Sequence, residues 1–355
     1  MKKRILTGIT TTGTPHVGNY LGAIKPSLDL AQENSESFFF LADYHALIKT
    51  QNTIDIRASV KDVALAWLSS GLDTNKSYFY KQSDIKEITE LSWILTCITA
   101  KGLMNRAHAY KAAIAENKSD EDKGINMGLF SYPILMASDI LIFNSTHVPV
   151  GSDQLQHLEM TRDIAQRFNH LYKQTFNIPE AIVQENKKVI PGLDGRKMSK
   201  SYNNIIPLLS DEKTLKKSIA KIVTNSLEPG DPKDPIGCNV FNLYTHFASI
   251  EQQSEFKNDY KEGISWGDAK NKLFNLINLE LMPIRDKYNK LQEDKNLVRD
   301  PNSKAILNTN IQGLAAYKKR KQTFAKIEKI DQLEDKVKSI ENKIDEVLTT
   351  LKKVL

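Results

Sequence analysis

Short apolar runs alternate with amphipathic stretches through the first half of the chain. Residues 37–42 (Ser-Phe-Phe-Phe-Leu-Ala) are almost wholly apolar, which is typical of a strand buried on both faces. Similar short runs occupy residues 4–9, 77–80 and 147–151, and residues 54–70 between them carry apolar side chains at helical spacing. Strands that alternate with helices predict an α/β fold with a Rossmann-like parallel sheet, helices on both faces, and ligands at the carboxyl ends of the strands.

The pattern changes after Asn204, where the sequence becomes helical almost throughout. Residues 213–221 form a basic amphipathic stretch, whereas three prolines within residues 228–235 predict a loop. Apolar residues in steps of three and four from Leu333 to Val354 predict a heptad-patterned helix. That helix could pair with a partner or, as we slightly favour, dock on its own domain. We therefore expect three parts, at residues 1–204, 205–330 and 331–355.

Composition narrows the class of protein. The 355 residues are 40% hydrophobic and 26% charged, with a net charge of +6 that permits a polyanionic partner without requiring one. Cys97 and Cys238 stand far apart, which argues against a disulfide scaffold or a metal site built on several thiolates. We find neither a signal peptide nor an apolar run long enough to span a membrane, so we expect a cytoplasmic protein with no membrane partner.

The first candidate phosphate site follows the first predicted strand and opens a helix. Gly13 allows a turn, Pro15 suits a helix start, and Gly18 removes a side chain so that a flat base can approach the backbone. Free N–H groups at a helix N-terminus attract phosphate, and His16 and Asn19 could reach a phosphate or ribose oxygen. On these residues alone, an ordinary strand–helix turn explains the segment equally well.

A second candidate site is more specific. Residues 196–204 read Arg-Lys-Met-Ser-Lys-Ser-Tyr-Asn-Asn, with Lys197 and Lys200 three positions apart. Lysine is a compact charge on a flexible stem and suits phosphates that move during a reaction, and Ser199 and Ser201 add hydroxyl donors. A solvated basic loop is the alternative, which so particular a run disfavours.

Together the two segments resemble the paired signatures of class I aminoacyl-tRNA synthetases. His-Val-Gly-Asn at residues 16–19 is similar to the first signature, and Lys-Met-Ser-Lys-Ser at residues 197–201 matches the second. The resemblance implies a Rossmann-like nucleotide domain followed by an α-helical anticodon-binding domain, in a homodimer. It also implies that the first motif binds ATP and that the lysines of the second stabilise the departing pyrophosphate.

The middle of the chain resembles the tryptophan-specific branch of that family, through residues 131–141 and 148–163. An indole offers one N–H donor and no acceptor, so its pocket needs one buried acceptor in an apolar shell. Asp139 can supply the acceptor, although it would equally accept from a tyrosine hydroxyl. Without the motif match, plain core packing would be the preferred reading of the neighbouring Met136, Val148 and Val150.

The resemblance implies a role for each matching residue. It gives the catalytic contacts to Lys197, Lys200, His16 and Thr12. The implied ATP contacts are Thr10, Thr11, Thr12, Gly18, Asn19, Gly151, Ser152, Asp153, Val189, Lys197, Met198, Ser199, Lys200 and Ser201. The implied tryptophan contacts are Asp139, Tyr132, Met136, Gln154, Val148, Val150 and His45, of which His45 is more simply read as structural. The run Thr10-Thr11-Thr12 replaces the family's usual Gln-Pro-Ser, which puts one ATP contact in doubt.

These expectations define a reaction with L-tryptophan, ATP and tRNA(Trp) as partners. Magnesium would arrive with ATP, and no metal site or tightly bound cofactor is expected. Residues 213–221 and 317–321 are basic faces that could meet tRNA or simply be solvated. Three alternatives stay open: a tyrosyl-specific relative, a nucleotidylyltransferase outside translation, and a non-catalytic RNA-binding paralogue.

Overall fold

The computed structural model describes residues 2–31, 35–117, 123–151, 154–183 and 189–293, together with two short strands beyond them. By its contacts the chain divides into two units, Met1–Leu291 and Gln292–Leu355. In the second unit, β6 (Leu297–Arg299) and β7 (Ile306–Asn308) form an antiparallel pair. The predicted heptad helix and the basic residues 317–321 lie outside the described residues. The predicted boundaries at residues 204 and 330 stay a prediction.

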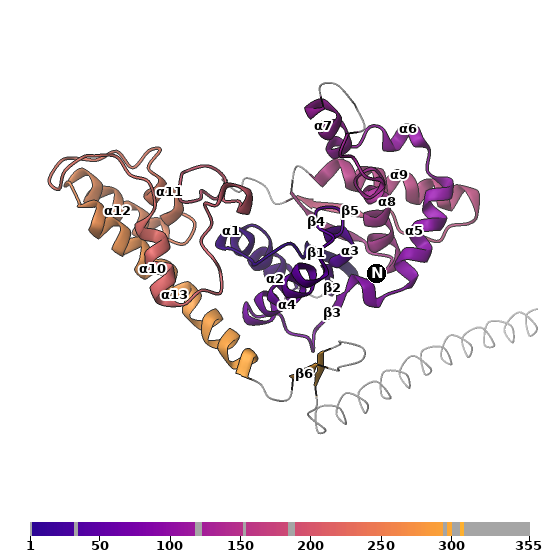
Figure 1. Cartoon of the computed structure of the whole chain (residues 1–355), viewed down its shortest axis with the longest axis horizontal. Helices are drawn as coiled ribbons and strands as arrows, with labels where there is room; N and C mark the ends of the chain where they lie inside the picture. The colour runs from indigo at the N-terminus through magenta and orange to yellow at the C-terminus, as the bar shows by residue number, and fades with distance from the viewer. Residues whose placement is uncertain are drawn as a thin grey trace, which may run out of the picture. The chain divides into compact units, whose positions relative to one another are not determined.

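A parallel sheet of five strands organises the first unit, in the order β3-β2-β1-β4-β5 (Figure 1). The strands are β1 (Lys3–Thr10), β2 (Ser35–Ala42), β3 (Ser77–Lys81), β4 (His147–Val150) and β5 (Glu180–Val183). The first four confirm the predicted strands, whereas β5 was not expected. From β1 the chain adds β2 and β3 on one side of that strand, and it then crosses back to add β4 and β5 on the other side. The carboxyl ends of β1 and β4 therefore flank a topological switch point, where ligands bind in open α/β sheets.

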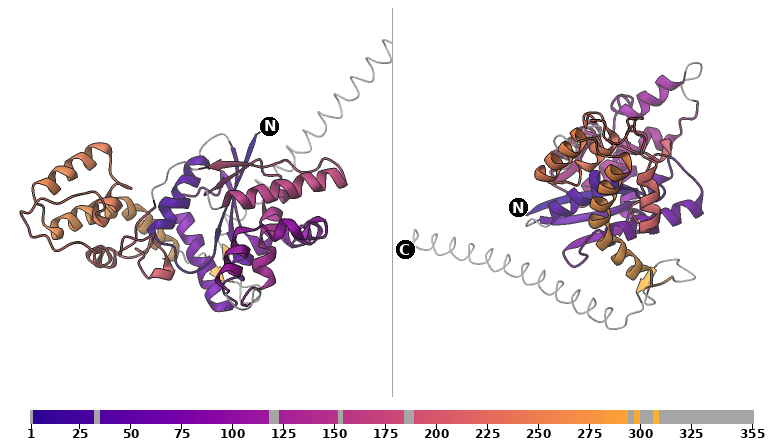
Figure 2. Two further views of the ribbon diagram at one scale, coloured as in Figure 1. Left: turned by 90° about the horizontal axis from the view of Figure 1, so that it is seen from above. Right: turned by 90° about the vertical axis from the view of Figure 1, so that its left-hand side faces the viewer.

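Helices cover both faces of the sheet, as predicted (Figure 2). Side chains alternate along β2: Phe39 and Leu41 pack with Trp67 in one core cluster, whereas Phe38 and Phe40 pack in another. Up to residue 183 the helices are α1 (Val17–Asn19), the π-helix η1 (Tyr20–Ile24), α2 (Lys25–Ala31), α3 (Asp43–Ala46), α4 (Thr53–Ser69), the 3₁₀-helix η2 (Gln82–Asp84), α5 (Glu87–Ile98), α6 (Lys101–Met104), α7 (His108–Glu116), α8 (Met127–Ile142) and α9 (Leu155–Leu171).

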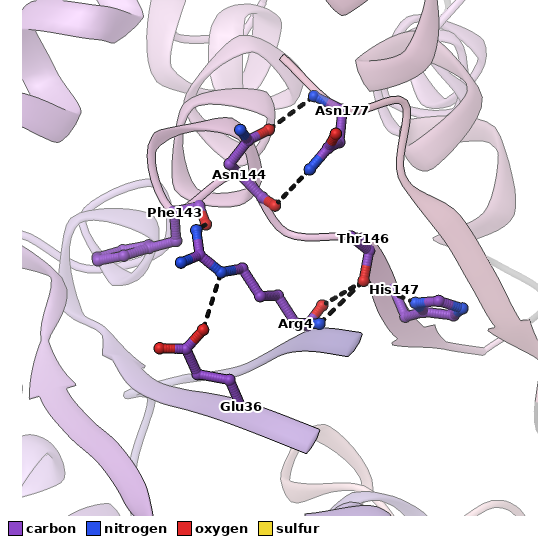
Figure 3. Close-up of polar contacts among 7 residues, drawn as sticks. All are labelled: Arg4, Glu36, Phe143, Asn144, Thr146, His147 and Asn177. Carbon is purple, nitrogen blue, oxygen red and sulfur yellow. Dashed lines mark hydrogen bonds and ion pairs between the residues drawn. The ribbon is translucent and has the colours of Figure 1, made fainter. Parts of the chain in front are cut away.

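The amino ends of the strands are tied together at the edge opposite the switch point (Figure 3). The Arg4 guanidinium donates to Glu36 on β2 (2.8 Å) and to the Phe143 carbonyl (3.1 Å). The Arg4 backbone N–H donates to the Thr146 hydroxyl (2.9 Å) just before β4. These contacts fix β1 against its neighbours, so the loops at the carboxyl ends are presented from a rigid base.

Between residues 200 and 293 the regular structure is helical, which confirms the predicted change of pattern there, whereas the strands β6 and β7 were not expected. It contains η4 (Lys200–Tyr202), α10 (Glu212–Ala220), α11 (Asn239–Tyr244), α12 (Ile250–Lys261) and α13 (Trp266–Glu293). Buried residues of these helices share one core cluster with the start of α1. The Tyr20 hydroxyl also donates to Glu280 on α13 (2.7 Å). None of the helices in the described part of the chain is long and apolar enough to cross a bilayer.

Candidate active site

The turn after β1 reaches the switch point. The Thr12 N–H donates to the Thr10 carbonyl (3.0 Å), and Gly13 follows with φ +66°, a left-handed conformation that favours glycine. The Gly13 N–H donates to the Ser59 hydroxyl of α4 (2.7 Å), a residue that the sequence analysis missed. Thr11 is fully buried, and its hydroxyl has no hydrogen-bond partner among the described residues. The hydrogen bond to Ser59 thus anchors the turn to α4.

His16 caps the helix that follows this turn. Its Nδ1 accepts from the Asn19 N–H (3.3 Å), while the Asn19 side chain accepts from the His16 N–H (3.1 Å), which forms a capping box. Burial, and then the nearby Lys200 ammonium, lower the pKa of His16 from 6.5 to about 4. His16 is therefore neutral at pH 7, as its acceptor role at Nδ1 requires. A direct contact of His16 or Asn19 with a nucleotide stays a prediction.

The Lys-Met-Ser-Lys-Ser segment lies directly against this helix start. The buried Met198 sulfur accepts from the Gly18 N–H (3.3 Å). Further along, the Val17 N–H donates to the Ile206 carbonyl (2.9 Å) and the Leu208 N–H to the Pro15 carbonyl (3.1 Å). Two motifs about 180 residues apart in sequence therefore form one surface, as a shared triphosphate site requires.

Lys200 extends from this segment to the turn after β1. Its Nζ donates to the Thr12 carbonyl and would lie 3.3 Å from a Cβ built on Gly13. Burial lowers the pKa of Lys200, and the carboxylate of Asp62 on α4 opposes that shift. Lys197 and Ser201 are exposed, and Ser199 is half-buried. One lysine thus contacts the turn after β1, and the side chain of the other is exposed to solvent.

Asn204 holds the lysine segment in shape, and the sequence analysis missed it. It is 2% exposed and accepts from the Ser199 N–H (2.8 Å). Its Nδ2 donates to Asp194 (2.6 Å) and to the Lys197 carbonyl (3.2 Å). The hydrogen bond from Asn204, followed by those from Arg196, lowers the pKa of Asp194. One buried amide therefore bonds at three points along the loop that carries both lysines.

Asp139 forms a second centre, on α8. It is 1% exposed, and its Oδ2 accepts from His45 Nε2 (2.8 Å). Gln82 Nε2 donates to both carboxylate oxygens, at 2.8 Å and 3.0 Å. Burial raises the pKa of Asp139, whereas the hydrogen bonds from His45 and Gln82 oppose that rise. The predicted acceptor is therefore buried and supported by two donors.

Comparison with known proteins agrees with this geometry. Residues 1–281 match the family model of the class I tRNA synthetases (W and Y). A tryptophan–tRNA ligase of Neisseria meningitidis is 53% identical over 304 residues, which cover 84% of this chain and 90% of the relative. This chain belongs to the tryptophanyl-tRNA synthetases of class I.

Other relatives are consistent with that family. A tryptophan–tRNA ligase of Pseudomonas aeruginosa is 56% identical over 299 residues, which cover 82% of this chain but only 66% of the relative. A Campylobacter jejuni tryptophanyl-tRNA synthetase, crystallised with ADP and tryptophan, matches with a TM-score of 0.76 at 44% identity. The match covers 92% of this chain and 98% of that one. A tyrosyl-tRNA synthetase from Archaeoglobus fulgidus, 19% identical with a TM-score of 0.59, shares the fold.

The remaining amino-acid contacts expected of a family member fall into two groups. The Tyr132 hydroxyl bonds to the His157 imidazole, whose Nδ1 lies 3.0 Å from Gln154 Oε1. The Tyr132 ring also meets the His45 ring edge-on, with centroids 6.3 Å apart. His45 therefore contacts Asp139 directly, and Tyr132 and Gln154 are connected to it through His45 and His157, a residue that the sequence analysis missed.

Val148 and Val150 are placed differently. Both are buried in the core cluster of β2, α8 and α9, and Met136 packs at its margin. This is the plain packing that the residues suggested without the motif, and a contact with tryptophan stays a prediction for all three. On the nucleotide side, Gly151 is exposed and Val189 is 65% exposed. Ser152 and Asp153 lie outside the described residues.

Proposed function

We propose that this chain activates L-tryptophan with ATP to give tryptophanyl-adenylate and pyrophosphate, and then transfers tryptophan to tRNA(Trp), releasing AMP. The observation that carries the proposal is the contact between the two motifs, in which Gly18 meets Met198 and Lys200 bonds to Thr12. A non-catalytic paralogue would have no reason to retain both lysines beside a helix N-terminus at the sheet's switch point.

The chemistry needs positioning and charge stabilisation rather than a covalent nucleophile. The tryptophan carboxylate attacks the α-phosphorus in line, and negative charge spreads to the departing pyrophosphate. We assign Lys197 and Lys200 to that charge, with Thr12 and the capped helix start as supporting donors. Magnesium would accompany ATP as part of the substrate and would supply positive charge to its phosphates.

Asp139 sets the amino-acid side of the proposal. Its carboxylate accepts a hydrogen bond from the indole N–H, and Tyr132 and Gln154 bind the ammonium group of the substrate. A tyrosine hydroxyl could also donate to Asp139, so the acceptor alone does not separate the two amino acids. The tryptophan-specific names of relatives above 50% identity favour tryptophan. The homodimer, the cytoplasmic location and the basic tRNA-facing segments remain predictions.

Amino-acid-dependent ATP–pyrophosphate exchange tests the proposal, with tryptophan, tyrosine and phenylalanine compared on the purified full chain. We expect exchange with tryptophan alone, followed by charging of tRNA(Trp). Exchange that depends on tyrosine would establish the tyrosyl alternative. Absence of exchange with every amino acid would favour the non-catalytic alternative.

A further inference from the structure

Gln82 is a buried residue that bonds to the predicted indole acceptor, Asp139, and that neither signature motif contains. It follows β3 directly, begins η2 and is fully buried. Its Oε1 accepts from the Tyr44 N–H (3.1 Å), and its Nε2 faces Asp139. A backbone N–H can only donate and an ionised carboxylate can only accept, so both contacts require the same orientation of the amide.

The position of Gln82 is fixed independently of Asp139. On the adjoining residue, the Ser83 N–H and hydroxyl both donate to Asp43, at 3.0 Å and 2.6 Å. With the Tyr44 contact, these bonds join η2 to α3 at several points. Gln82 is therefore a donor held in place before any ligand enters, which is the condition for preorganisation.

The two carboxylate oxygens of Asp139 differ in how many further hydrogen bonds they can accept. Among the described residues, Oδ2 accepts from both His45 and Gln82, whereas Oδ1 accepts from Gln82 alone. A carboxylate oxygen can accept two hydrogen bonds, so one further position remains on Oδ1. A substrate N–H that approaches Asp139 would take that position, and an isostere without the donor would leave it unpaired.

We infer that Gln82 is a positioning residue for substrate selection: with His45 it holds the Asp139 carboxylate so that the remaining acceptor position of Oδ1 receives the indole N–H. This inference rests on the proposed function. It adds that discrimination between indole and an isostere without the N–H depends on Gln82, which does not itself touch the substrate. Sites built to hydrogen-bond an N–H reject analogues that lack it, because a buried acceptor is then left unsatisfied.

The test compares L-tryptophan with its benzothiophene analogue, in which sulfur replaces the indole N–H. In Gln82→Met, which keeps the length of the side chain but removes the donor, we expect the wild-type preference for tryptophan to fall about tenfold or more. The change should appear in KM for tryptophan, with kcat and the exchange reaction of the analogue nearly unchanged. Exchange with the analogue also shows that the variant is folded.

A matched control is Gln253→Met on α12. Gln253 donates to the Ala248 carbonyl (3.0 Å), so the same chemical change removes a backbone contact far along the chain from Asp139. We expect its preference for tryptophan to equal that of the wild type. An unchanged preference in Gln82→Met would overturn the inference, as would an equal loss in Gln253→Met.

A second variant keeps the inference testable if Gln82→Met fails to fold. Gln82→Glu preserves the shape and sets a second carboxyl against Asp139, among His45, Asp43 and Tyr80. The pair shares a proton at low pH and loses it as the pH rises, so KM for tryptophan should increase with pH relative to the wild type. A KM that follows the wild-type profile would refute the inference. A wild-type chain without tryptophan-dependent exchange would instead refute the proposed function.

Discussion

Replacing Gly18 with alanine tests whether the contact between the two motifs controls activity. A Cβ at this position would lie 2.9 Å from His16 Nδ1, 3.0 Å from His16 Cε1 and 3.4 Å from the Met198 Cβ. The His16 ring is 7% exposed and caps the helix through the same nitrogen, so it cannot turn away without losing that bond. The substitution therefore displaces His16, Met198 or both.

The expected effect on stability is small, because two contributions oppose each other. Alanine in a helix is favoured over glycine by about 0.5–1 kcal/mol. Loss of the capping interaction costs about 1 kcal/mol. The free energy of unfolding should therefore change by less than about 1 kcal/mol. Activity should fall much further, because a shift of about 1 Å in catalytic groups costs on the order of 10²-fold in rate.

Gly22→Ala is the matched control. A Cβ on Gly22 would have the Ile190 Cδ1 at 3.8 Å as its nearest neighbour, an ordinary contact. Tryptophan-dependent ATP–pyrophosphate exchange and urea unfolding should be measured on both variants. We expect Gly22→Ala to be active and about 0.5–1 kcal/mol more stable than the wild type. Exchange by Gly18→Ala within about threefold of the wild type would refute the reasoning.

Three further predictions follow from the same site. Lys200→Ala should reduce adenylate formation by about 10²-fold or more, measured by exchange, and an unchanged rate would remove Lys200 from the mechanism. Asn204→Ala should lower the free energy of unfolding by about 1–3 kcal/mol in urea, because it removes three hydrogen bonds that each contribute about 0.5–1.5 kcal/mol; a smaller loss would contradict its bracing role. The pKa of His16 is about 4 in the folded chain and 6.5 in the unfolded chain, so the unfolded chain binds a proton more readily. The stability that neutral His16 contributes is therefore fully present above pH 6.5 and is lost as the pH falls toward about 4. Urea unfolding across that range should show this loss, and His16→Asn should flatten it.

Several parts of the molecule were predictable from local pattern. Residues 37–42 were predicted as a strand buried on both faces, because so continuous an apolar run is typical of one, and β2 confirms it. The strand β5 was missed because it has four residues, partly exposed, without a distinctive pattern. The lysine motif predicted a phosphate-handling loop, because lysine is a compact charge on a flexible stem and the serines add hydroxyl donors, and that role stays a prediction.

The residues that orient the chemical groups could not be found in this way. Gln82 and Asp139 are 57 residues apart, and Lys200 meets Thr12 across 188 residues. Asn204 lies within the quoted motif, yet no local rule shows that its amide braces the loop. A hydrogen bond between distant segments depends on where the whole chain places two side chains, and one sequence contains no periodic signal of that distance.

The sequence by itself therefore determined most of the strands and helices of the first unit and where charged groups suited to phosphate occur. These properties depend on burial and charge, which are set residue by residue. Only the tertiary structure decided that the glycine-rich helix start meets Met198, that His16 is neutral, and that Asp139 is held by Gln82 and His45. Each of these depends on desolvation and contact, which exist only after distant parts of the chain have packed together.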